Sequence, residues 1–236
     1  MERAAEAARE GNAQYFFNLG DDELIKLCQK RDEDGRSLLH SAVVGGNMHL
    51  VQLLVERCGN ERINSQDSEG WTPLTSAVSC GFEEIVKYLL SLGADPNSTN
   101  AQNRTPLHYA ASKGRVPIIK LLIEAGAKTN TKDIAGWLPL HRAASAGRAE
   151  ALRELLLHTS KPLINARDIS GSTPLLLAAS GGHQAAAVLL AAKGADVEAE
   201  DKDGQTPLGA AAPHGQLRDA LVALATGEKT LDDFEN

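Results

Sequence analysis

The chain has 236 residues, of which 42% are hydrophobic and 4% aromatic, and its formal net charge is −7. This negative balance argues against general nucleic-acid binding and against an anionic membrane surface, because both need clustered Lys and Arg. A core of Ala, Leu, Val and Ile favours closely packed helices over strands, and no apolar run reaches the roughly 18 residues that span a bilayer.

The start of the chain and its cysteines bear on its compartment. The first residues, MERAAEAAREGN, are charged and lack the apolar run of a signal peptide. The three cysteines, Cys28, Cys58 and Cys80, are odd in number, and no Cys or His spacing resembles a metal site. We therefore interpret all three as reduced thiols of an intracellular protein.

One tetrapeptide recurs along the chain at intervals of 33 or 35 residues. Its six copies read SLLH, TPLT, TPLH, LPLH, TPLL and TPLG, and they begin at residues 37, 72, 105, 138, 173 and 206. Pro suits the first turn of a helix, because its missing N–H would be unpaired there, and the preceding Thr can cap the free amides. A later Gly in each unit allows the left-handed residue that ends the first helix. A second apolar run follows, so each unit is a helix pair that buries its apolar face only by stacking.

This pattern resembles the ankyrin repeat over nearly the whole chain. The resemblance implies an all-α ankyrin-repeat solenoid of seven helix-turn-helix units with β-hairpin tips. The first unit would have helices over residues 4–10 and 22–30, and Pro213 would interrupt the first helix of the last unit. We expect a degenerate N-terminal capping unit, five full repeats, a C-terminal capping unit and a polar tail over residues 1–31, 32–203, 204–226 and 227–236.

The histidines are the obvious candidates for catalysis. His40, His108 and His141 occupy the fourth position of the tetrapeptide. In ankyrin repeats the imidazole ring of the histidine at this position links neighbouring loops by hydrogen bonds. His183 occupies the equally common Gly-His position. No Gly-rich loop precedes a Lys-Ser/Thr phosphate signature. We therefore predict no enzymatic activity, no metal and no cofactor.

The surface that carries function in this fold is made of the tips and the first helices, which line a concave face. Both tryptophans, Trp71 and Trp137, stand at a tip, where we expect no core to receive them. Trp and Arg dominate interface hot spots, so these two residues are predicted contacts. The other candidates are Arg36 and Arg104 at tips, and Tyr109, Lys113 and Arg142 on first helices; for the last three a packing or solvated role is an equal alternative.

Charge is distributed unevenly along the chain. Residues 1–99 carry a net charge of −7, residues 100–170 carry +6, and residues 171–236 carry −6. One interpretation is an ordinary solvated surface. The segregation nevertheless favours a partner with alternating patches of opposite sign, because complementary charge speeds encounter and fixes register.

Four runs narrow the resemblance to the gankyrin family: RTPLHYAASKGR at 104–115, GWTPL at 70–74, EIVK at 84–87 and HRAA at 141–144. The resemblance implies a monomeric assembly chaperone of the 26S proteasome regulatory particle, found in cytoplasm and nucleus. It would cradle the C-terminal domain of a base ATPase subunit, and Asp34, Arg36 and Lys113 match charged residues of the family that contribute to the grip.

One motif departs from that family. Animal gankyrin carries a Leu-x-Cys-x-Glu motif, and the matching run here, LAASG at 177–181, has neither Cys nor Glu. Retinoblastoma binding by that route is therefore not expected. The alternative function is a generic ankyrin adaptor in a signalling, transcriptional or ubiquitin-ligase complex, because ankyrin cores are reused widely.

Overall fold

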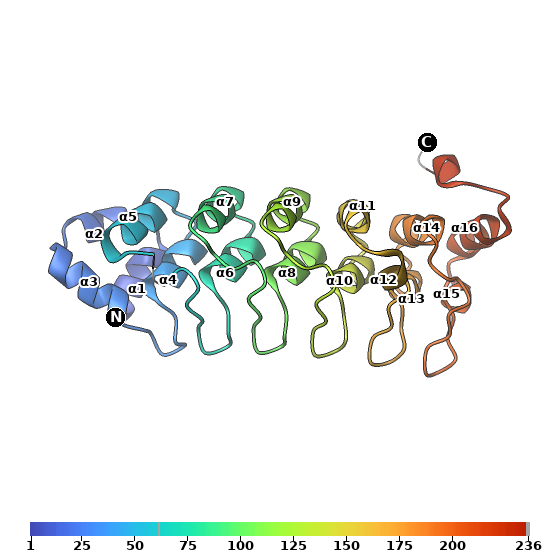
Figure 1. Cartoon of the computed structure of the whole chain (residues 1–236), viewed down its shortest axis with the longest axis horizontal. Coiled ribbons are helices and arrows are strands. Elements are labelled where there is room, and N and C mark those ends of the chain that lie inside the picture. Colours follow the sequence, from blue (N-terminus) through green and yellow to red (C-terminus); the bar gives the residue numbers. More distant parts are fainter. Residues whose placement is uncertain (61, 235–236) are drawn as a thin grey trace. The chain divides into compact units, whose positions relative to one another are not determined.

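The computed structural model describes residues 1–60 and 62–234. Within these residues the named elements are sixteen α-helices and one short 3-10 helix. Figure 1 labels the α-helices along the chain. The helices of the N-terminal part are α1 (Glu2–Arg9), α2 (Ala13–Phe17), α3 (Asp21–Gln29), α4 (Leu38–Val44), α5 (Met48–Cys58), α6 (Pro73–Cys80), α7 (Glu83–Ser91), α8 (Pro106–Lys113) and α9 (Val116–Glu124). Those that follow are α10 (Pro139–Ser145), α11 (Ala149–Leu157), α12 (Lys161–Ile164), α13 (Pro174–Ser180), α14 (Gln184–Ala192), α15 (Pro207–Ala210), α16 (Gly215–Thr226) and η1 (Leu231–Phe234).

The described residues form two compact units, residues 1–106 with 121–127 and residues 107–120 with 128–234. In the first unit α1, α4 and α6 pack in succession, and α3, α5 and α7 pack in a parallel row. In the second unit α10, α13 and α15 form one row, and α11, α14 and α16 form the other. Within each unit every repeat therefore gives its first helix to one layer and its second helix to the next, which confirms the predicted all-α repeat fold.

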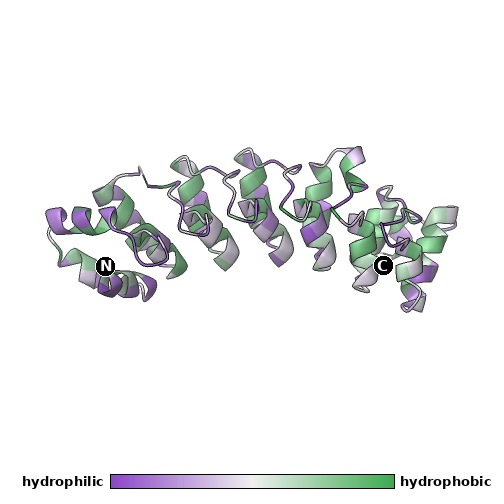
Figure 2. Ribbon diagram, turned by 90° about the horizontal axis from the view of Figure 1, so that it is seen from below, coloured by the Kyte–Doolittle hydropathy of each residue, from purple (hydrophilic) through white to green (hydrophobic). Residues whose placement is uncertain are grey.

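The repeated tetrapeptide starts the first helices as its chemistry predicts. The Thr72 hydroxyl accepts a hydrogen bond from the Thr75 N–H at 3.1 Å, and Pro73 is the first residue of α6. The leucine at the third position is fully buried in each of three repeats, as Leu74, Leu107 and Leu140. Figure 2 shows that most helices are apolar on one side and polar on the other, the pattern of helices that bury a single face.

The tips are hydrogen-bonded turns and not the expected β-hairpins. In the described part of the chain the one β-type pairing outside helices is an isolated bridge between Arg31 and Ser37. At the second tip the Asp67 N–H donates to the Trp71 carbonyl at 2.9 Å, and the Asp67 carboxylate accepts from the Trp71 N–H at 2.8 Å. The Asp side chain thus satisfies amides that a strand ladder would otherwise pair, so the tip needs no strands.

Several elements at the ends and between repeats differ from expectation. The helices predicted over residues 4–10 and 22–30 correspond to α1 and α3, but α2 between them was not predicted. The helix α12 fills one of the two 35-residue intervals, and α15 is only four residues long, as Pro213 leads us to expect. The division into capping units and full repeats stays a prediction. The predicted polar tail contains η1, and its residues 235–236 lie outside the described residues.

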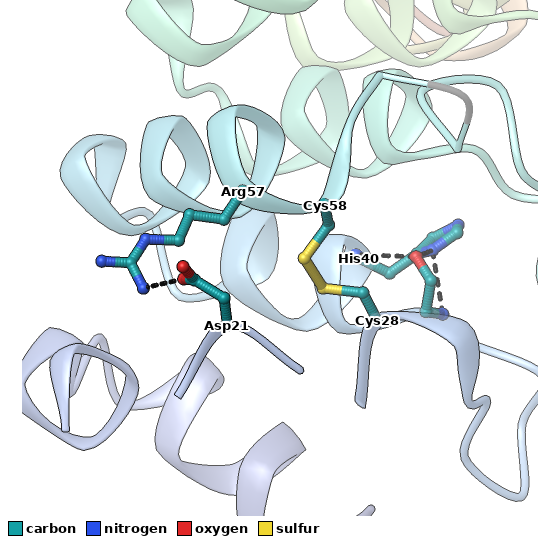
Figure 3. The surroundings of a disulfide bond; sticks show 6 residues. Asp21, Cys28, His40, Arg57 and Cys58 are labelled. Atoms are coloured by element: carbon teal, nitrogen blue, oxygen red, sulfur yellow. Dashed lines mark hydrogen bonds and ion pairs between the residues drawn. A yellow bond between two sulfur atoms is a disulfide. The ribbon is translucent and has the colours of Figure 1, made fainter. Parts of the chain in front are cut away.

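A disulfide joins Cys28 at the end of α3 to Cys58 at the end of α5, so the prediction of three reduced thiols is wrong for these two (Figure 3). The packing of α3 on α5 brings their Cα atoms to 6.3 Å although 30 residues separate them. An ion pair between Asp21 and Arg57 links the same two helices. Closing a loop of this length stabilises the fold by roughly 3–4 kcal/mol in the chain-entropy account.

A membrane-spanning helix is not found within the described residues, where no helix is long and apolar enough to cross a bilayer.

Candidate protein-binding surface

Neighbouring repeats are tied together by the hydrogen bonds of four histidines, of which His40, His108 and His141 are buried. The His40 Nε2 donates to the Trp71 carbonyl at 2.9 Å, and the His108 Nε2 lies 3.0 Å from the Trp137 carbonyl. The His141 Nε2 lies 3.0 Å from the Ala166 carbonyl, and the His183 ring bonds to the Ser145 carbonyl. All four histidines therefore have the structural role that their positions predict. His40, His108 and His141 hold successive tips in register, and His183, at the start of α14, links that helix to the end of α10.

Successive tips within each unit are also joined by backbone hydrogen bonds. In the first unit the Ser68 N–H donates to the Asp34 carbonyl and the Ala101 N–H to the Glu69 carbonyl, both at 2.9 Å. In the second unit the Ile169 N–H donates to the Ala135 carbonyl at 3.1 Å. Each tip approaches the next so closely that a Cβ on Gly70 would lie 2.9 Å from the Asn100 Cα. The tips of one unit consequently present their side chains as a fixed row.

The first unit carries a charged cluster at its tips. Arg36 lies 3.1 Å from the Asp34 carboxylate and 3.6 Å from that of Asp67. Asp34 is well exposed, whereas the Asp67 side chain is only 6% exposed because it also caps its own tip. Two of the predicted contact residues, Asp34 and Arg36, are thus brought together as an exposed ion pair that contributes little to stability by itself.

A cavity of about 250 Å³ opens next to this cluster. It is bounded by the tip residues Arg36, Glu69 and Trp71 and by the exposed ends of α4 and α6, Val44 and Cys80. An aromatic face, an aliphatic side chain and charges of both signs therefore meet in one hollow. That is the composition of a protein-binding hot spot.

Arg104 stands at the third tip of the first unit. Its N–H donates to the Asn100 side chain at 2.9 Å, and the tip closes as the others do. Asn103 has a φ of 56°, so the Asn that replaces the usual Gly takes the left-handed conformation, which Asn tolerates better than most residues. Arg104 is half-buried and does not line the cavity beside Trp71.

In the second unit Trp137 is held by its own repeat and by the next. Its indole N–H donates to the Asp168 carboxylate at 2.7 Å, and the Arg142 guanidinium lies 4.4 Å from the centre of its ring. Arg142 also forms an ion pair with Asp133, whose side chain is fully buried. Two predicted contact residues, Trp137 and Arg142, are thus joined in a packed intrachain cluster, and packing is the alternative that this geometry favours for Arg142.

The ionisation of this cluster is biased toward the charged carboxylates. Burial by itself raises the pKa of Asp133, but hydrogen bonds from Arg142 and from the Trp137 N–H outweigh it and hold the pKa below its usual value. Burial also raises the pKa of Asp168 by itself, but hydrogen bonds from Ser170, Ser172 and Trp137 outweigh this effect. The pKa of Asp168 is therefore lowered as well. Both carboxylates consequently stay ionised at neutral pH and hold the cluster together.

Tyr109 and Lys113 lie on the first helix α8, one repeat earlier in the sequence. Tyr109 is half-buried, and Lys113, the last residue of α8, is exposed. The side chain of Lys113 is therefore available for contact with a partner. Of the predicted contacts in the second unit it has the most exposed position.

Sequence reasoning missed Val44, Ser76 and Cys80 of the cavity. Val44 ends α4, and Cys80 ends α6 at the helix position where α8 has Lys113. An apolar or thiol side chain at the solvent-facing end of a first helix is the signal that could have identified the hollow. Glu69 could have been found as a charged residue at the same tip as Trp71.

Within residues 1–60 and 62–234, no group of three or more His, Cys, Asp or Glu side chains is arranged to hold a metal ion.

The family of the chain follows from comparison with known proteins. A model of ankyrin repeats in three copies matches residues 4–100, 92–168 and 140–232. The chain therefore belongs to the ankyrin-repeat family. Ankyrin repeats bind other proteins, and this chain is a protein-binding module of that kind.

Individual relatives match only part of the chain. It is 46% identical over 65 residues to human protein phosphatase 1 regulatory subunit 27, covering 28% of the chain and 41% of that relative. It is 46% identical over 65 residues to the 26S proteasome non-ATPase regulatory subunit 10 of Dictyostelium discoideum, covering 28% of each. It is 41% identical over 90 residues, 34% of the chain, to mouse ankyrin repeat and SAM domain-containing protein 6, of which the match covers 10%. Each match thus spans less than half of the relative's length.

Proposed function

We propose that this chain is an assembly chaperone of the 26S proteasome regulatory particle and binds the C-terminal domain of a base ATPase subunit. The observation that carries the proposal is the hollow of the first unit, where Trp71 lies beside Arg36, Glu69 and the end of α4. The partial similarity to a proteasome non-ATPase regulatory subunit also supports this proposal. No chemistry is performed in this role, so the chain acts through affinity and timing alone.

The residues divide this task between anchoring and steering. Trp71 can insert apolar surface against the partner, and its position beside charged groups provides register. Asp34 and Lys113 are exposed charges of opposite sign on the two units. Exposed charges act mainly on the rate of encounter, which falls as salt rises. We therefore assign affinity to Trp71 and association rate to Asp34, Arg36 and Lys113.

The test is a titration of the chain against isolated C-terminal domains of the base ATPases at low and moderate salt. We expect strong preference for one domain. Trp71→Ala should weaken that binding by about 2 kcal/mol, roughly 30-fold. Lys113→Glu should slow association and change its salt dependence. The matched control is Lys87→Glu, the same change at an exposed position on the second helix α7.

The outcomes separate clearly. Loss of binding in Trp71→Ala and Lys113→Glu, with Lys87→Glu unaffected, supports the proposal. If the chain is folded by circular dichroism and binds none of the domains, the chaperone function is excluded.

A second candidate is the adaptor function, and the match to a protein phosphatase 1 regulatory subunit favours it. An affinity purification of the tagged chain from its native extract distinguishes the two. Free proteasome base subcomplexes in the eluate favour the chaperone. A phosphatase, kinase, transcription factor or cullin favours the adaptor.

Placement in cytoplasm and nucleus and a monomeric state are part of the chaperone proposal. The Cys28–Cys58 disulfide removes the cysteine-based support for an intracellular placement, since disulfides persist mainly in oxidising compartments. The placement therefore depends on the partner, and imaging of the tagged chain tests it. Sedimentation at micromolar concentration tests the monomeric state.

A further inference from the structure

The helix α14 is apolar around its whole circumference. Its sequence, QAAAVLLAA, has no charged residue, whereas the other second helices α7 and α11 read EEIVKYLLS and AEALRELLL. Five consecutive residues from Ala186 to Leu190 are buried, among them Val188 at 4% and Leu189 at 2% exposed. A helix that is apolar on all sides needs cover on more than the face it packs into its own repeat.

The segment that follows α16 supplies part of this cover. The chain turns at Gly227, which has a φ of +74°, and the Lys229 N–H donates to the Ala223 carbonyl at 3.2 Å. The helix η1 then contacts α14, and Figure 1 shows the segment turning back from α16. The predicted polar tail thus carries two apolar side chains, Leu231 and Phe234, and both are half-buried.

The geometry of η1 presents these two side chains together. The Thr230 N–H and hydroxyl both donate to the Asp233 carboxylate, at 2.7 and 3.1 Å, which caps the turn. Residues three apart are nearly eclipsed in a 3-10 helix, so Leu231 and Phe234 face the same side. Asp232 and Asp233 lie between them in the sequence and are exposed. The segment is therefore a short amphipathic motif, Leu-Asp-Asp-Phe.

The motif does not fill the space that it covers. A cavity of about 290 Å³ lies between α11, α14 and η1, bounded by Ala149, Arg153, Val188, Leu189, Leu231 and Phe234. The Arg153 side chain is 44% exposed at the rim and lies 3.7 Å from Glu150. Glu150 lines the same rim, so the carboxylates of an occupant would compete with Glu150 for Arg153. A four-residue helix above an unfilled cavity is a shallow contact and can exchange.

We propose that the groove between α11 and α14 is a second protein-binding site. It takes a short partner segment with a leucine and an aromatic residue three positions apart and acidic residues between them. The segment 228–234 is a built-in occupant that the partner displaces. This site lies on the second helices and is separate from the tips and first helices of the proposed function.

The probe for this site is a fluorescein-labelled peptide of residues 228–236, titrated by anisotropy. The receiving protein is the full chain with Leu231→Ala and Phe234→Ala, which vacates the groove. A tethered segment has an effective concentration on the order of mM, so the unaltered chain should bind the peptide about tenfold or more weakly than the double variant. A peptide with the same two alanines should not bind.

Two further variants locate the site in the double-variant chain. Arg153→Glu should reduce peptide binding about tenfold, because it reverses the charge at the rim. The control, Lys202→Glu, also reverses a positive charge, at an exposed tip of the same unit, and should have no effect. Arg153 and Lys202 are exposed, so neither variant is expected to unfold the chain, and a loss of peptide binding can be assigned to the site.

Three results would overturn the proposal. In the first, the peptide binds neither chain. In the second, it binds both chains equally, which means that segment 228–234 does not occupy the groove. In the third, the double variant self-associates in sedimentation, which means that a second copy covers α14. Each of these results leaves the titration against ATPase domains unaffected, so failure here is distinguishable from failure of the proposed function.

Discussion

Trp71 and Trp137 occupy the same position of two repeats, yet their surroundings differ. The Arg142 guanidinium lies over the Trp137 ring, and the Trp137 indole donates to Asp168. In the repeat of Trp71 the residue at the Arg142 position is Ser76, and a cavity of about 250 Å³ opens there. One residue after the tetrapeptide therefore decides whether the space beside a tip tryptophan is filled by the chain or is left for a partner.

The comparison separates two uses of the same tip. Around Trp137 the charged side chains of Arg142 and Asp133 pair with each other, so this tip is a rigid part of the second unit. Around Trp71 the small side chain of Ser76 leaves the hollow that carries the proposed function. The two tryptophans stand at the same position of the repeat, and the residue one turn into the following helix, Arg142 or Ser76, is one that distinguishes their surroundings.

The largest expected effect tests whether Trp71 belongs to the surface at all. Leu107 is fully buried, so Leu107→Ala should lower the free energy of unfolding by roughly 2–5 kcal/mol. Trp71 is half-buried at a tip, so Trp71→Ala should cost about 1 kcal/mol. Urea denaturation measures both. Equal losses would mean that Trp71 is a core residue and would remove it as an interface anchor.

The next largest expected effect concerns the tip of Trp137, where Arg142 covers the ring. Arg142→Ala would leave the buried Asp133 carboxylate without its partner and should lower the free energy of unfolding by roughly 3 kcal/mol. Ser76→Ala, at the same position of the other repeat, should change it by less than about 0.5 kcal/mol. The two variants are compared in one denaturant series. A small loss in Arg142→Ala would show that the pair is solvated and that the two tips are alike.

The helices could be predicted from sequence because their signals are local. Thr-Pro starts a helix and Asn103 takes a left-handed backbone through interactions within a few residues. The histidine contacts could also be predicted, since His40 and His141 stand at a fixed position of a repeat whose neighbour is always one period away. In a repeat protein, most of the helical framework can therefore be predicted from the sequence.

The rest depends on packing that the sequence pattern does not contain. Cys28 and Cys58 are 30 residues apart, and only the contact between α3 and α5 makes them partners. For Arg142 three roles were open, and its distance to Asp133 and Trp137 selects packing. The polar composition of residues 227–236 concealed the apolar pair of η1, because two residues in ten do not alter an average.

A pH titration should sharpen the comparison further, because His141 stacks on Trp137 while Thr75 stands at the same position beside Trp71. Burial lowers the pKa of His141 to about 4. The unfolded chain, with a histidine pKa near 6.5, binds more protons between these values. Stability is therefore full above about pH 6.5 and falls toward pH 4, by at most roughly 3 kcal/mol from this residue.

Unfolding free energies between pH 7.5 and 4.5 measure this loss. His141→Gln should flatten the slope, because it removes the buried imidazole. An unaltered slope in His141→Gln would mean that other groups cause the acid sensitivity. His40, whose pKa burial also lowers, is the first candidate. Below about pH 4 the lowered pKa values of Asp133 and Asp168 add to the loss, since their pairing needs the ionised form.

A small effect on stability is expected from exchanging the residue that follows the tetrapeptide at the two tips. Ser76→Arg should place a guanidinium beside Trp71, as Arg142 lies beside Trp137, and should change the free energy of unfolding by no more than about 1 kcal/mol. The hollow would then be filled by the chain. Acrylamide quenching of fluorescence reports this directly when Trp137→Phe leaves Trp71 as the remaining tryptophan.

In that background Ser76→Arg should reduce quenching of Trp71, because the added side chain excludes the quencher from the cavity. Ser91→Arg, which adds the same charge at an exposed site on α7, serves as the control and should leave quenching unchanged. Binding to the preferred ATPase domain should weaken in parallel, since the anchor would no longer be accessible. If Ser76→Arg leaves both quenching and binding unchanged, the residue after the tetrapeptide does not control access to the tip. Trp71 and Trp137 would then owe their difference to the next repeat, where Asn100 stands in place of Asp168.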